Sequence, residues 1–247
     1  MSTSGHSTYF GRHISGQFNV ELESIRTHVL TMGGLVEQQL TFAMQALHKD
    51  NRELARQVVQ DDEKVNAMDL SINEACTRII AKRQPTAKDL RLIMAIVKTI
   101  TDLERIGDVA TQIVTCTVLD DSSAGASHNE RLAVSLAPLF RQAISMLHQV
   151  LDAFARMDLQ AAAQVHKLDD KIDAECQTVS DQLTKAMIES PQQIPYLLQL
   201  MWSARAIERV GDRCQNLCEY IVYFVTGKDV RHLGVEGMYT LIEQTHS

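Results

Sequence analysis

Apolar residues recur every three or four positions along most of this chain, which is the spacing that places them on one face of an α-helix. The first such stretch contains Phe18, Leu22, Ile25, Val29, Met32, Val36, Leu40, Ala43 and Leu47. A second stretch, capped by Asp50 or Asn51, runs to about Lys82. A capping box that begins at Thr86 predicts a third helix, which ends at about Leu119.

The same scheme repeats in the second half of the chain. The apolar spacing predicts a fourth helix from about Glu130 to Arg156. Asp158 is the expected cap of a fifth helix that runs to about Glu189. The pair Ser190-Pro191 then starts a sixth helix, because proline is favoured in the first turn, and Gly227 ends that helix.

These helices divide the chain into two similar halves of three helices each. The expected fold is all-α, with two tandem three-helix bundles related by an internal repeat, over residues 17–120 and 130–227. The segment 121–129 consists of small and polar residues, with three Ser and two Ala, and is predicted to be the linker. Residues 1–16 and 228–247 are predicted to be flexible termini.

The phrase Glu-Arg-x-Gly-Asp occurs twice, 104 positions apart, once on the third predicted helix and once on the sixth. It places Glu104 beside Asp108 and Glu208 beside Asp212, because residues four apart are neighbours on a helix surface. Both pairs continue an apolar stripe. Like charges that lean toward a core are unfavourable unless they are compensated, and a bound cation is the natural compensation.

Each copy of the phrase also holds a glycine, Gly107 or Gly211. Glycine destabilises a helix by about 0.5–1 kcal/mol relative to alanine, so we expect each to permit the close approach of another group. A single acidic pair is usually a solvated helix face, where Arg105 or Arg209 could form surface ion pairs. The repetition of the whole phrase favours metal binding over that interpretation.

The second helix of each half offers a matching set of acids. With a shift of 107 positions, Asp62 and Asn66 align with Asp169 and Asp173. Adjacent antiparallel helices would bring these side chains to the phrase on the next helix. Oxygen ligands suit hard cations such as Mg, Mn, Ca or iron. Because Asn66 removes one negative charge, we expect the first site to bind metal more weakly than the second.

Composition restricts the remaining possibilities. The net charge of −7 argues against nucleic-acid binding, which needs a basic surface. The five cysteines lie in predicted helices and are expected to be buried free thiols. No signal peptide or membrane-spanning run is visible, so we expect a cytoplasmic protein that meets a membrane only through partners.

Further stretches carry a resemblance to a known family. They are His13–Asn19, Glu21–Arg26, Met32-Gly33-Gly34, Arg78–Pro85 and Asp89–Arg91. Together with the doubled Glu-x-x-x-Asp phrase, the length and the midpoint linker, they make the chain resemble the PhoU family over nearly all of its length. The resemblance implies two three-helix bundles and metal clusters of iron, zinc, manganese or magnesium held by acidic side chains.

The resemblance also implies a function and a set of ligands. PhoU-like proteins are negative regulators of the phosphate-starvation response that stand between the ATPase subunit of the Pst phosphate transporter and the sensor kinase PhoR, often as dimers or higher oligomers. The metal motif falls on Glu104, Asp108, Glu208 and Asp212, with Asp62, Asp169 and Asp173 as partners from the neighbouring helices.

Two alternatives stay open from the residues alone. The first is a carboxylate-bridged metal hydrolase or oxidase in a helical bundle. The acidic pairs contain no His, and no nucleophile and base are visible, which weighs against catalysis. The second is a plain helical scaffold with solvated acids. The sequence favours a non-catalytic adaptor that uses metal.

Overall fold

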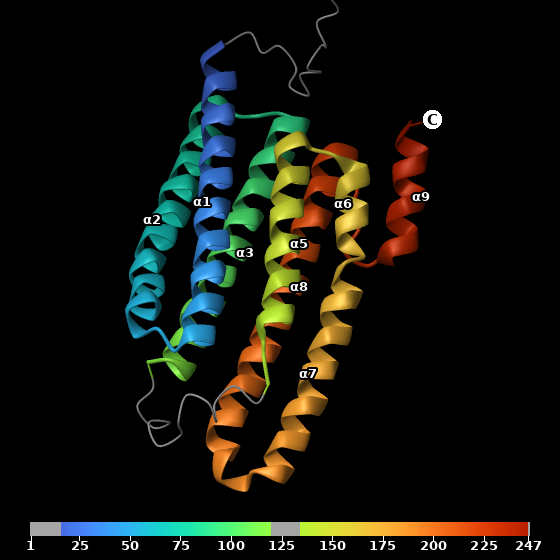
Figure 1. The fold of residues 1–247 in the computed structure, drawn as a ribbon. Coiled ribbons are helices and arrows are strands. Elements are labelled where there is room, and N and C mark those ends of the chain that lie inside the picture. The colour runs from blue at the N-terminus through green and yellow to red at the C-terminus, as the bar shows by residue number, and fades with distance from the viewer. Residues whose placement is uncertain (1–15, 120–133, 247) are drawn as a thin grey trace, which may run out of the picture.

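The computed structural model describes residues 16–119 and 134–246, apart from the side chains of residues 235, 245 and 246. Within these ranges every regular element is a helix (Figure 1). The helices are α1 (Gly16–Lys49), α2 (Arg52–Arg83), α3 (Ala87–Thr117), α5 (Ala137–Arg156), α6 (Leu159–His166), α7 (Asp169–Glu189), the short 3₁₀ helix η2 (Pro191–Gln193), α8 (Ile194–Thr226) and α9 (Gly234–His246). The predicted all-α class and the repeated helical scheme are confirmed.

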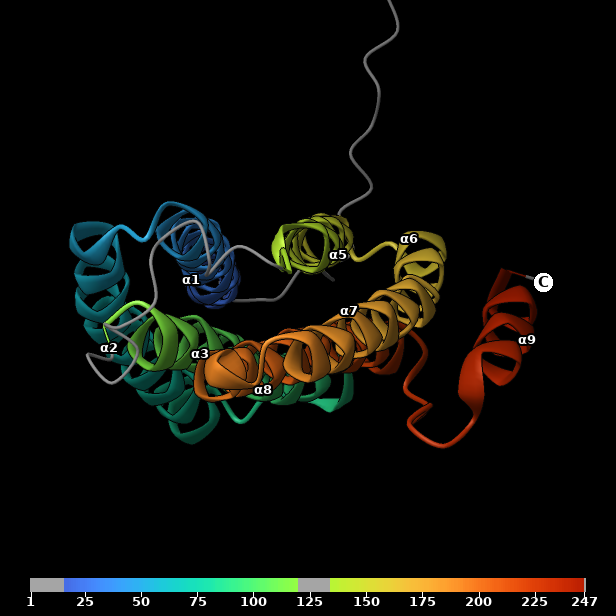
Figure 2. The same ribbon diagram turned by 60° about the horizontal axis from the view of Figure 1, so that its bottom comes forward.

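The two halves are packed on each other through their central helices. Helix α3 lies along α8, and α1 and α5 lie together on one side of this pair (Figure 2). Helix α2 flanks α1 and α3, while α7 flanks α5 and α8. The third helix of each half is therefore surrounded on several sides, and this position explains its long buried stripe.

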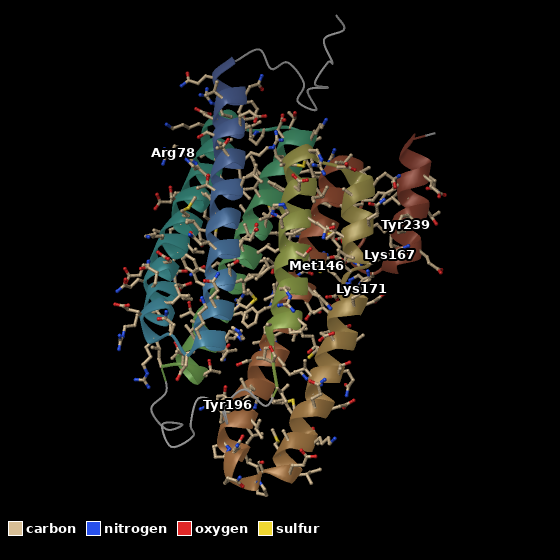
Figure 3. All side chains as sticks on the ribbon, in the orientation of Figure 1. Arg78, Met146, Lys167, Lys171, Tyr196 and Tyr239 are labelled. Atoms are coloured by element: carbon tan, nitrogen blue, oxygen red, sulfur yellow. The ribbon has the colours of Figure 1, made fainter. Side chains whose placement is uncertain are left out.

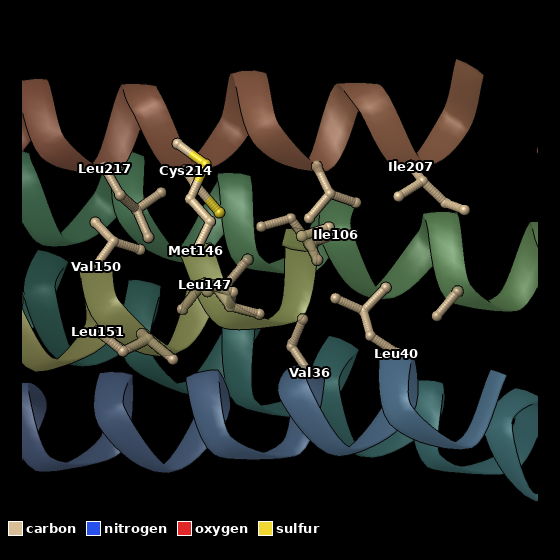
Figure 4. Packing of buried hydrophobic residues seen from close by; sticks show 14 of the residues in the cluster. Val36, Leu40, Ile106, Met146, Leu147, Val150, Leu151, Ile207, Cys214 and Leu217 are labelled. Carbon is tan, nitrogen blue, oxygen red and sulfur yellow. The ribbon is translucent and has the colours of Figure 1, made fainter. Parts of the chain in front are cut away.

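One hydrophobic core runs through both halves. Figure 4 shows Val36 and Ile106 from the first half packed near Met146 and Ile207 from the second. All four side chains are buried. The broad apolar faces predicted from the sequence therefore meet across the repeat as well as within it, and they join the bundles into one body.

Helix caps lie where the sequence places them. The side chain of Asn51 accepts a hydrogen bond from the amide of Leu54, and that of Asp158 accepts one from the amide of Ala161. Gly227 ends α8 in the left-handed conformation, with a φ of 75°. At Thr86 the side chain makes no cap bond, although the residue does precede the helix.

Two predicted helix boundaries in the second half were wrong. Residues 134–136 are not helical, so the described part of the fourth predicted helix begins at Ala137 and not near Glu130. The fifth predicted helix is two helices, α6 and α7, which are separated by a turn at residues 167–168. The turn lies immediately before Asp169, which is the first residue of α7.

The C-terminal segment also differs from its prediction as a flexible terminus. Residues 234–246 form α9, which buries Met238, Leu241 and Ile242 in a small second core. The other side of that core includes Leu159 and Ala163 of α6 and Val222 of α8. The ammonium group of Lys167 lies 4.1 Å from the ring centre of Tyr239 in the same region (Figure 3). The predicted linker 121–129 lies outside the described residues, as does nearly all of the segment 1–16.

Candidate metal centres

The repeated acids lie at the border between the core and the surface. Glu104 on α3 and Glu208 on α8 are half-buried, whereas Asp108 and Asp212, one turn later, are exposed. The apolar neighbours of each glutamate, such as Ile106, are fully buried. The acids therefore flank the buried stripe, and none of the four lies within it.

The first cluster combines α3 with α2. Its acids are Asp62 and Asp69 on α2 and Glu104 and Asp108 on α3. Burial raises the pKa of Glu104, and the negative charges of Asp108, Asp69 and Asp62 raise it further. The pKa of Asp108 is raised by burial and by Asp62. Helices α2 and α3 therefore hold these carboxylates near enough to affect one another electrostatically.

Asp62 is also fixed from two directions by amide side chains. The Nε2 atom of Gln39 on α1 donates to Asp62 Oδ1 over 3.3 Å, and the Nδ2 atom of Asn66 donates to Asp62 Oδ2 over 3.1 Å. Gln39 is buried, with an exposed fraction of 1%. The sequence reading missed Gln39, because nothing in its own helix distinguishes it from other polar residues on α1.

The second cluster combines α8 with α7. Its acids are Asp169 and Asp173 on α7 and Glu208 and Asp212 on α8. Burial raises the pKa of Asp169 to about 7, with further contributions from Asp173 and Asp212. The pKa values of Asp173 and Asp212 are raised by burial and then by their acidic neighbours. Arg205 offsets part of this charge through hydrogen bonds of 3.0 Å to both oxygens of Glu208.

Asp169 is the most unusual of these acids. Only 5% of the residue is exposed, and its Oδ1 atom has no hydrogen-bond partner among the described residues. A buried carboxylate oxygen without a donor is unfavourable by about 1–3 kcal/mol or more. Such an atom can be satisfied by a hydrogen-bond donor, by its own proton or by a cation.

The two glycines of the repeated phrase allow the helices to approach. A Cβ built at Gly107 would lie 2.9 Å from Gln39 Oε1 and 3.3 Å from Asp62 Oδ1. At Gly211 a Cβ would overlap Asp169 Oδ1 outright. Each glycine therefore leaves room for the first aspartate of the neighbouring helix, and the expectation of a close approach is confirmed.

Asp69 changes the comparison of the two clusters. The shift of 107 positions aligns Asn66 and Asp69 with Asp173 and Cys176. Each cluster consequently has four carboxylates. Three of them align in the repeat, whereas the fourth is Asp69 in the first cluster and Asp173 in the second, at positions that do not align. The prediction that the first site binds metal more weakly than the second was based on a count of negative charges that omitted Asp69. With Asp69 included the two clusters have equal numbers of carboxylates, so the charge count no longer supports that prediction. Asp69 lies seven residues after Asp62, and this two-turn spacing was the signal that could have revealed it.

The donor chemistry of both clusters fits a hard or borderline cation. Four carboxylates from two helices match the oxygen ligands of Mg, Mn, Ca or iron, and the orphan oxygen of Asp169 is a free ligand atom. Among the described residues no three His, Cys, Asp or Glu side chains already converge at ligand spacing. Metal binding at either cluster therefore requires side-chain rotation toward a shared centre.

Asp102, an acidic residue outside both clusters, joins the two halves without resembling a metal ligand. Only 4% of Asp102 is exposed. It accepts hydrogen bonds from Arg213 Nη1 at 3.1 Å, Asn216 Nδ2 at 3.3 Å and the hydroxyl of Tyr220 at 2.9 Å, all on α8. The sequence reading missed it because the repeat has alanine, Ala206, at the matching position.

Exposed apolar side chains precede the acids on both central helices. On α8 they are Ile194 and Leu198, each 37% exposed, and Trp202, which is 65% exposed. On α3 they are Leu90 and Met94, which occupy the positions of Ile194 and Leu198 in the repeat. We call Ile194, Leu198 and Trp202 the α8 apolar stripe. In the described part of the chain no helix has the length and apolar character that spanning a bilayer requires.

Comparison with known proteins places this geometry in a family. The PhoU domain family matches residues 29–117 and 136–221. A phosphate-specific transport system accessory protein PhoU from Serratia marcescens is 55% identical over 231 residues, which are 94% of this chain and 93% of that protein. The protein of the same name from Escherichia coli (strain K12) is 54% identical over 228 residues, 92% of this chain and 93% of its own.

Solved structures agree with these matches. The crystal structure of PhoU from Pseudomonas aeruginosa superimposes with a TM-score of 0.79 at 40% sequence identity, and the match covers 86% of this chain and 100% of that one. The phosphate transport system regulatory protein PhoU from Streptococcus pneumoniae gives a TM-score of 0.77 at 28% identity, over 87% of this chain and 99% of that one. Both matches extend over the two halves together.

Proposed function

The chain belongs to the PhoU family, and on that premise we propose that it is a negative regulator of the phosphate-starvation response and a modulator of phosphate uptake. In this proposal it acts as a metal-binding adaptor between the Pst phosphate transporter and the sensor kinase PhoR. The observation that carries the proposal is the match to phosphate-specific transport system accessory proteins over 94% of the chain.

The acidic clusters give the adaptor its metal sites. Glu104, Asp108, Asp62 and Asp69 hold one metal centre, and Glu208, Asp212, Asp169 and Asp173 hold the other. Bound cations of the Mg, Mn, Fe or Zn type supply positive charge between neighbouring carboxylates. The raised pKa values of six of these eight acids support this role, because each reports charge repulsion or burial that a cation would relieve.

The proposed role is non-catalytic. Asp62 and Asp169 each lie on a different helix from the repeated phrase, so these acids, holding a metal together with the acids of the phrase, would join α2 to α3 and α7 to α8. The fixed pair then presents the exposed apolar residues of α3 and α8 in one defined orientation. Support for a docking role comes from the α8 apolar stripe, because exposed large apolar residues in a row are typical of interaction sites.

The partners in this proposal are the ATPase subunit of the transporter and PhoR, and the protein works in the cytoplasm as a homodimer or a higher oligomer. Regulation follows if the adaptor binds its partners with different affinity in phosphate-rich and phosphate-poor cells, since only differential affinity shifts such an equilibrium.

A genetic test uses a bacterium that carries a phosphate-starvation reporter and lacks its own copy of this gene. The wild-type chain is expected to silence the reporter in phosphate-rich medium. A variant with Glu104→Ala, Asp108→Ala, Glu208→Ala and Asp212→Ala is expected to leave it active. Elemental analysis of both purified proteins, with circular dichroism as a control for folding, separates loss of metal from loss of structure.

Two results would contradict parts of the proposal. A wild-type chain that does not silence the reporter would contradict the regulatory role. A quadruple variant that silences the reporter fully while holding no metal would remove the metal from the mechanism and leave an acidic docking surface. Hydrolysis of a phosphate ester by the metal-loaded protein would favour the enzyme alternative.

A further inference from the structure

A groove of about 510 Å³ lies between α5 and α7, whereas the second acidic cluster lies between α7 and α8. The polar side chains on its α5 wall are Arg141, Gln142, Ser145 and Gln149. On the opposite wall lie Leu168, in the turn before α7, and Lys171, in the first turn of that helix (Figure 3). The groove therefore begins directly beside the break between α6 and α7.

The two cations of this groove are unpaired. Arg141 and Lys171 are both exposed, and neither has an ion-pair partner among the described residues. The described residues that line the groove include no Asp or Glu. Two positive charges thus face one space in a chain whose net charge is −7, and no carboxylate of the lining competes for them. This arrangement favours an anion.

The neutral side chains of the α5 wall add hydrogen-bond donors. The Nε2 atom of Gln149 donates to Ser145 Oγ over 3.1 Å. Because that oxygen already accepts a bond, and its own hydrogen has no acceptor among the described residues, the Ser145 hydroxyl is available to donate to a ligand. The described lining contains no aromatic side chain. The groove therefore offers charge and hydrogen bonds, and no ring on which a base could stack.

Comparison with the first half shows how the lysine became free. With the shift of 107 positions, Lys171 aligns with Lys64 and Leu168 aligns with Asp61. In the first half the Nζ atom of Lys64 lies 2.6 Å from Asp61 Oδ1, so that lysine is neutralised within its own helix. In the second half leucine replaces the acid, and the ammonium group of Lys171 remains available.

The α5 wall differs from α1 in the same direction. Arg141 aligns with Gly34, and Gln149 aligns with Phe42, which is partly buried against the core. One substitution adds a cation, and the other exchanges an apolar side chain for an amide. At these positions the first half has a balanced lysine and aspartate, whereas the second half has two cations and no acid.

The size of the groove restricts the ligand. Its α5 wall extends from residue 138 to residue 149, which is about 16 Å along a helix. The volume lies within the range of small-molecule sites, about 300–1,000 Å³. A single phosphate ion would occupy only a small part of this space, whereas a chain of phosphates can reach both walls. The guanidinium of arginine and the ammonium of lysine both bind phosphate oxygens well.

We propose that the groove between α5 and α7 binds a chain of linked phosphate groups, which contacts Arg141 on one wall and Lys171 on the other. Short inorganic polyphosphates and nucleoside triphosphates share this chemistry. The site is separate from both acidic clusters and from the α8 apolar stripe. The inference therefore goes beyond the proposed function and does not depend on metal binding.

The test is isothermal titration calorimetry of the purified full chain at low salt, in buffer freed of metal ions, with tripolyphosphate as the probe. Arg141→Gln and Lys171→Gln are each expected to weaken binding about tenfold, because each removes one charged contact at an exposed residue. Lys64→Gln is the matched control, since that lysine aligns with Lys171 but lies outside the groove, and it should bind normally.

A second variant restores the acid of the first half. Leu168→Asp is expected to pair with Lys171 as Asp61 pairs with Lys64, and so to weaken binding about tenfold without the loss of either cation. Circular dichroism checks that this variant folds. The glutamine variants keep the proposal testable if it does not, because they change only exposed side chains.

Three further probes identify the ligand. Orthophosphate should bind at least about tenfold more weakly than tripolyphosphate, because it reaches one cation at a time. ATP without metal that binds as tightly as tripolyphosphate would show that the phosphate chain alone is recognised. Tighter binding of ATP that still requires Arg141 and Lys171 would identify a nucleotide as the source of the chain. Citrate that binds as tightly as tripolyphosphate would overturn the assignment to phosphate.

Other outcomes would overturn the site itself. They are the absence of tripolyphosphate binding, binding that is unchanged in the double variant Arg141→Gln with Lys171→Gln, and an equal loss in Lys64→Gln. None of these results bears on the proposed regulatory role, which the reporter and the metal analysis test separately. Conversely, a chain that fails to silence the reporter can still bind tripolyphosphate in this groove.

Discussion

The Oδ1 atom of Asp169 lies against the backbone of Gly211, so closely that a Cβ at that position would overlap it. Two features of the second half are thereby linked. Gly211, in the interior of the continuous helix α8, is the reason that α7 can place a carboxylate beside α8. The aspartate in turn is buried with an oxygen that no described donor satisfies.

The first prediction concerns this contact. Gly211→Ala is expected to lower the free energy of unfolding of the metal-free protein by about 1–2 kcal/mol, because the displacement of Asp169 outweighs the helix propensity gained. Gly107→Ala is the matched control. Its Cβ would meet the end of the longer Gln39 side chain, so we expect a change within about 1 kcal/mol. Urea unfolding measures both, and equal destabilisation would contradict the asymmetry.

The second prediction concerns pH. The pKa of Asp169 is raised from 3.8 to about 7, mainly by burial, so the folded state binds this proton more tightly than the unfolded state does. For this group, stability is full below the unfolded pKa and is lost as pH rises from about 4 through about 7. Asp169→Asn should therefore stabilise the metal-free protein at about pH 8 and have less effect at about pH 5.

Chemical unfolding of wild type and Asp169→Asn at both pH values checks this prediction, because the other acids are shared and largely cancel in the difference. A variant that is destabilised equally at both pH values would contradict it. Added Zn²⁺ or Mn²⁺ should remove the advantage of the variant at high pH, since the wild-type carboxylate is then neutralised by a cation.

Most helices could be predicted because their apolar spacing is a local property. The break between α6 and α7 could not, since Val165, Leu168 and Ile172 keep the spacing of threes and fours across the turn and no Gly or Pro marks it. The late start of α5 did have a signal, because Pro138 lies in its first turn.

The candidate site was predictable only where it repeats. Glu104, Asp108, Glu208 and Asp212 stand out because the phrase around them occurs twice. Comparison of the two halves does not identify Asp69, because its counterpart in the second half is Cys176 and not an acid. Its importance comes from packing between helices, which no local pattern records. Helix α9 is a similar case, because the surface that covers it belongs to α6 and α8.

The third prediction concerns the junction of the halves. Asp102→Ala leaves Arg213, Asn216 and Tyr220 without their shared acceptor, and we expect it to destabilise the protein by about 2–4 kcal/mol. Tyr220→Phe removes one of the three donors and should have the smaller effect of about 1 kcal/mol. Thermal and urea unfolding measure both. Metal content should stay near the wild-type value in Tyr220→Phe. A loss of metal in that variant would show that the hydrogen bonds to Asp102 and metal binding at the acidic clusters depend on each other.

The last prediction uses Trp202, the single tryptophan of the chain, which is 65% exposed at the end of the α8 apolar stripe. Because the side chain is largely solvated, Trp202→Ala should change the free energy of unfolding by no more than about 0.5 kcal/mol. The affinity of this variant for the ATPase subunit of the transporter or for PhoR should nevertheless fall at least about tenfold, as expected when a large aromatic anchor of an interface is removed. Ile188→Ala, at an exposed residue of α7 outside the stripe, is the matched control and should bind almost normally.

Fluorescence gives an independent reading of the same event. In the wild type, docking should move the emission of Trp202 to shorter wavelength, because the indole leaves water as the partner covers it. An unchanged spectrum together with normal binding of Trp202→Ala would place the docking face elsewhere on the molecule. A spectral shift that requires metal would connect the stripe to the acidic cluster that follows it on α8, since Glu208 lies six residues beyond Trp202 on the same rigid helix.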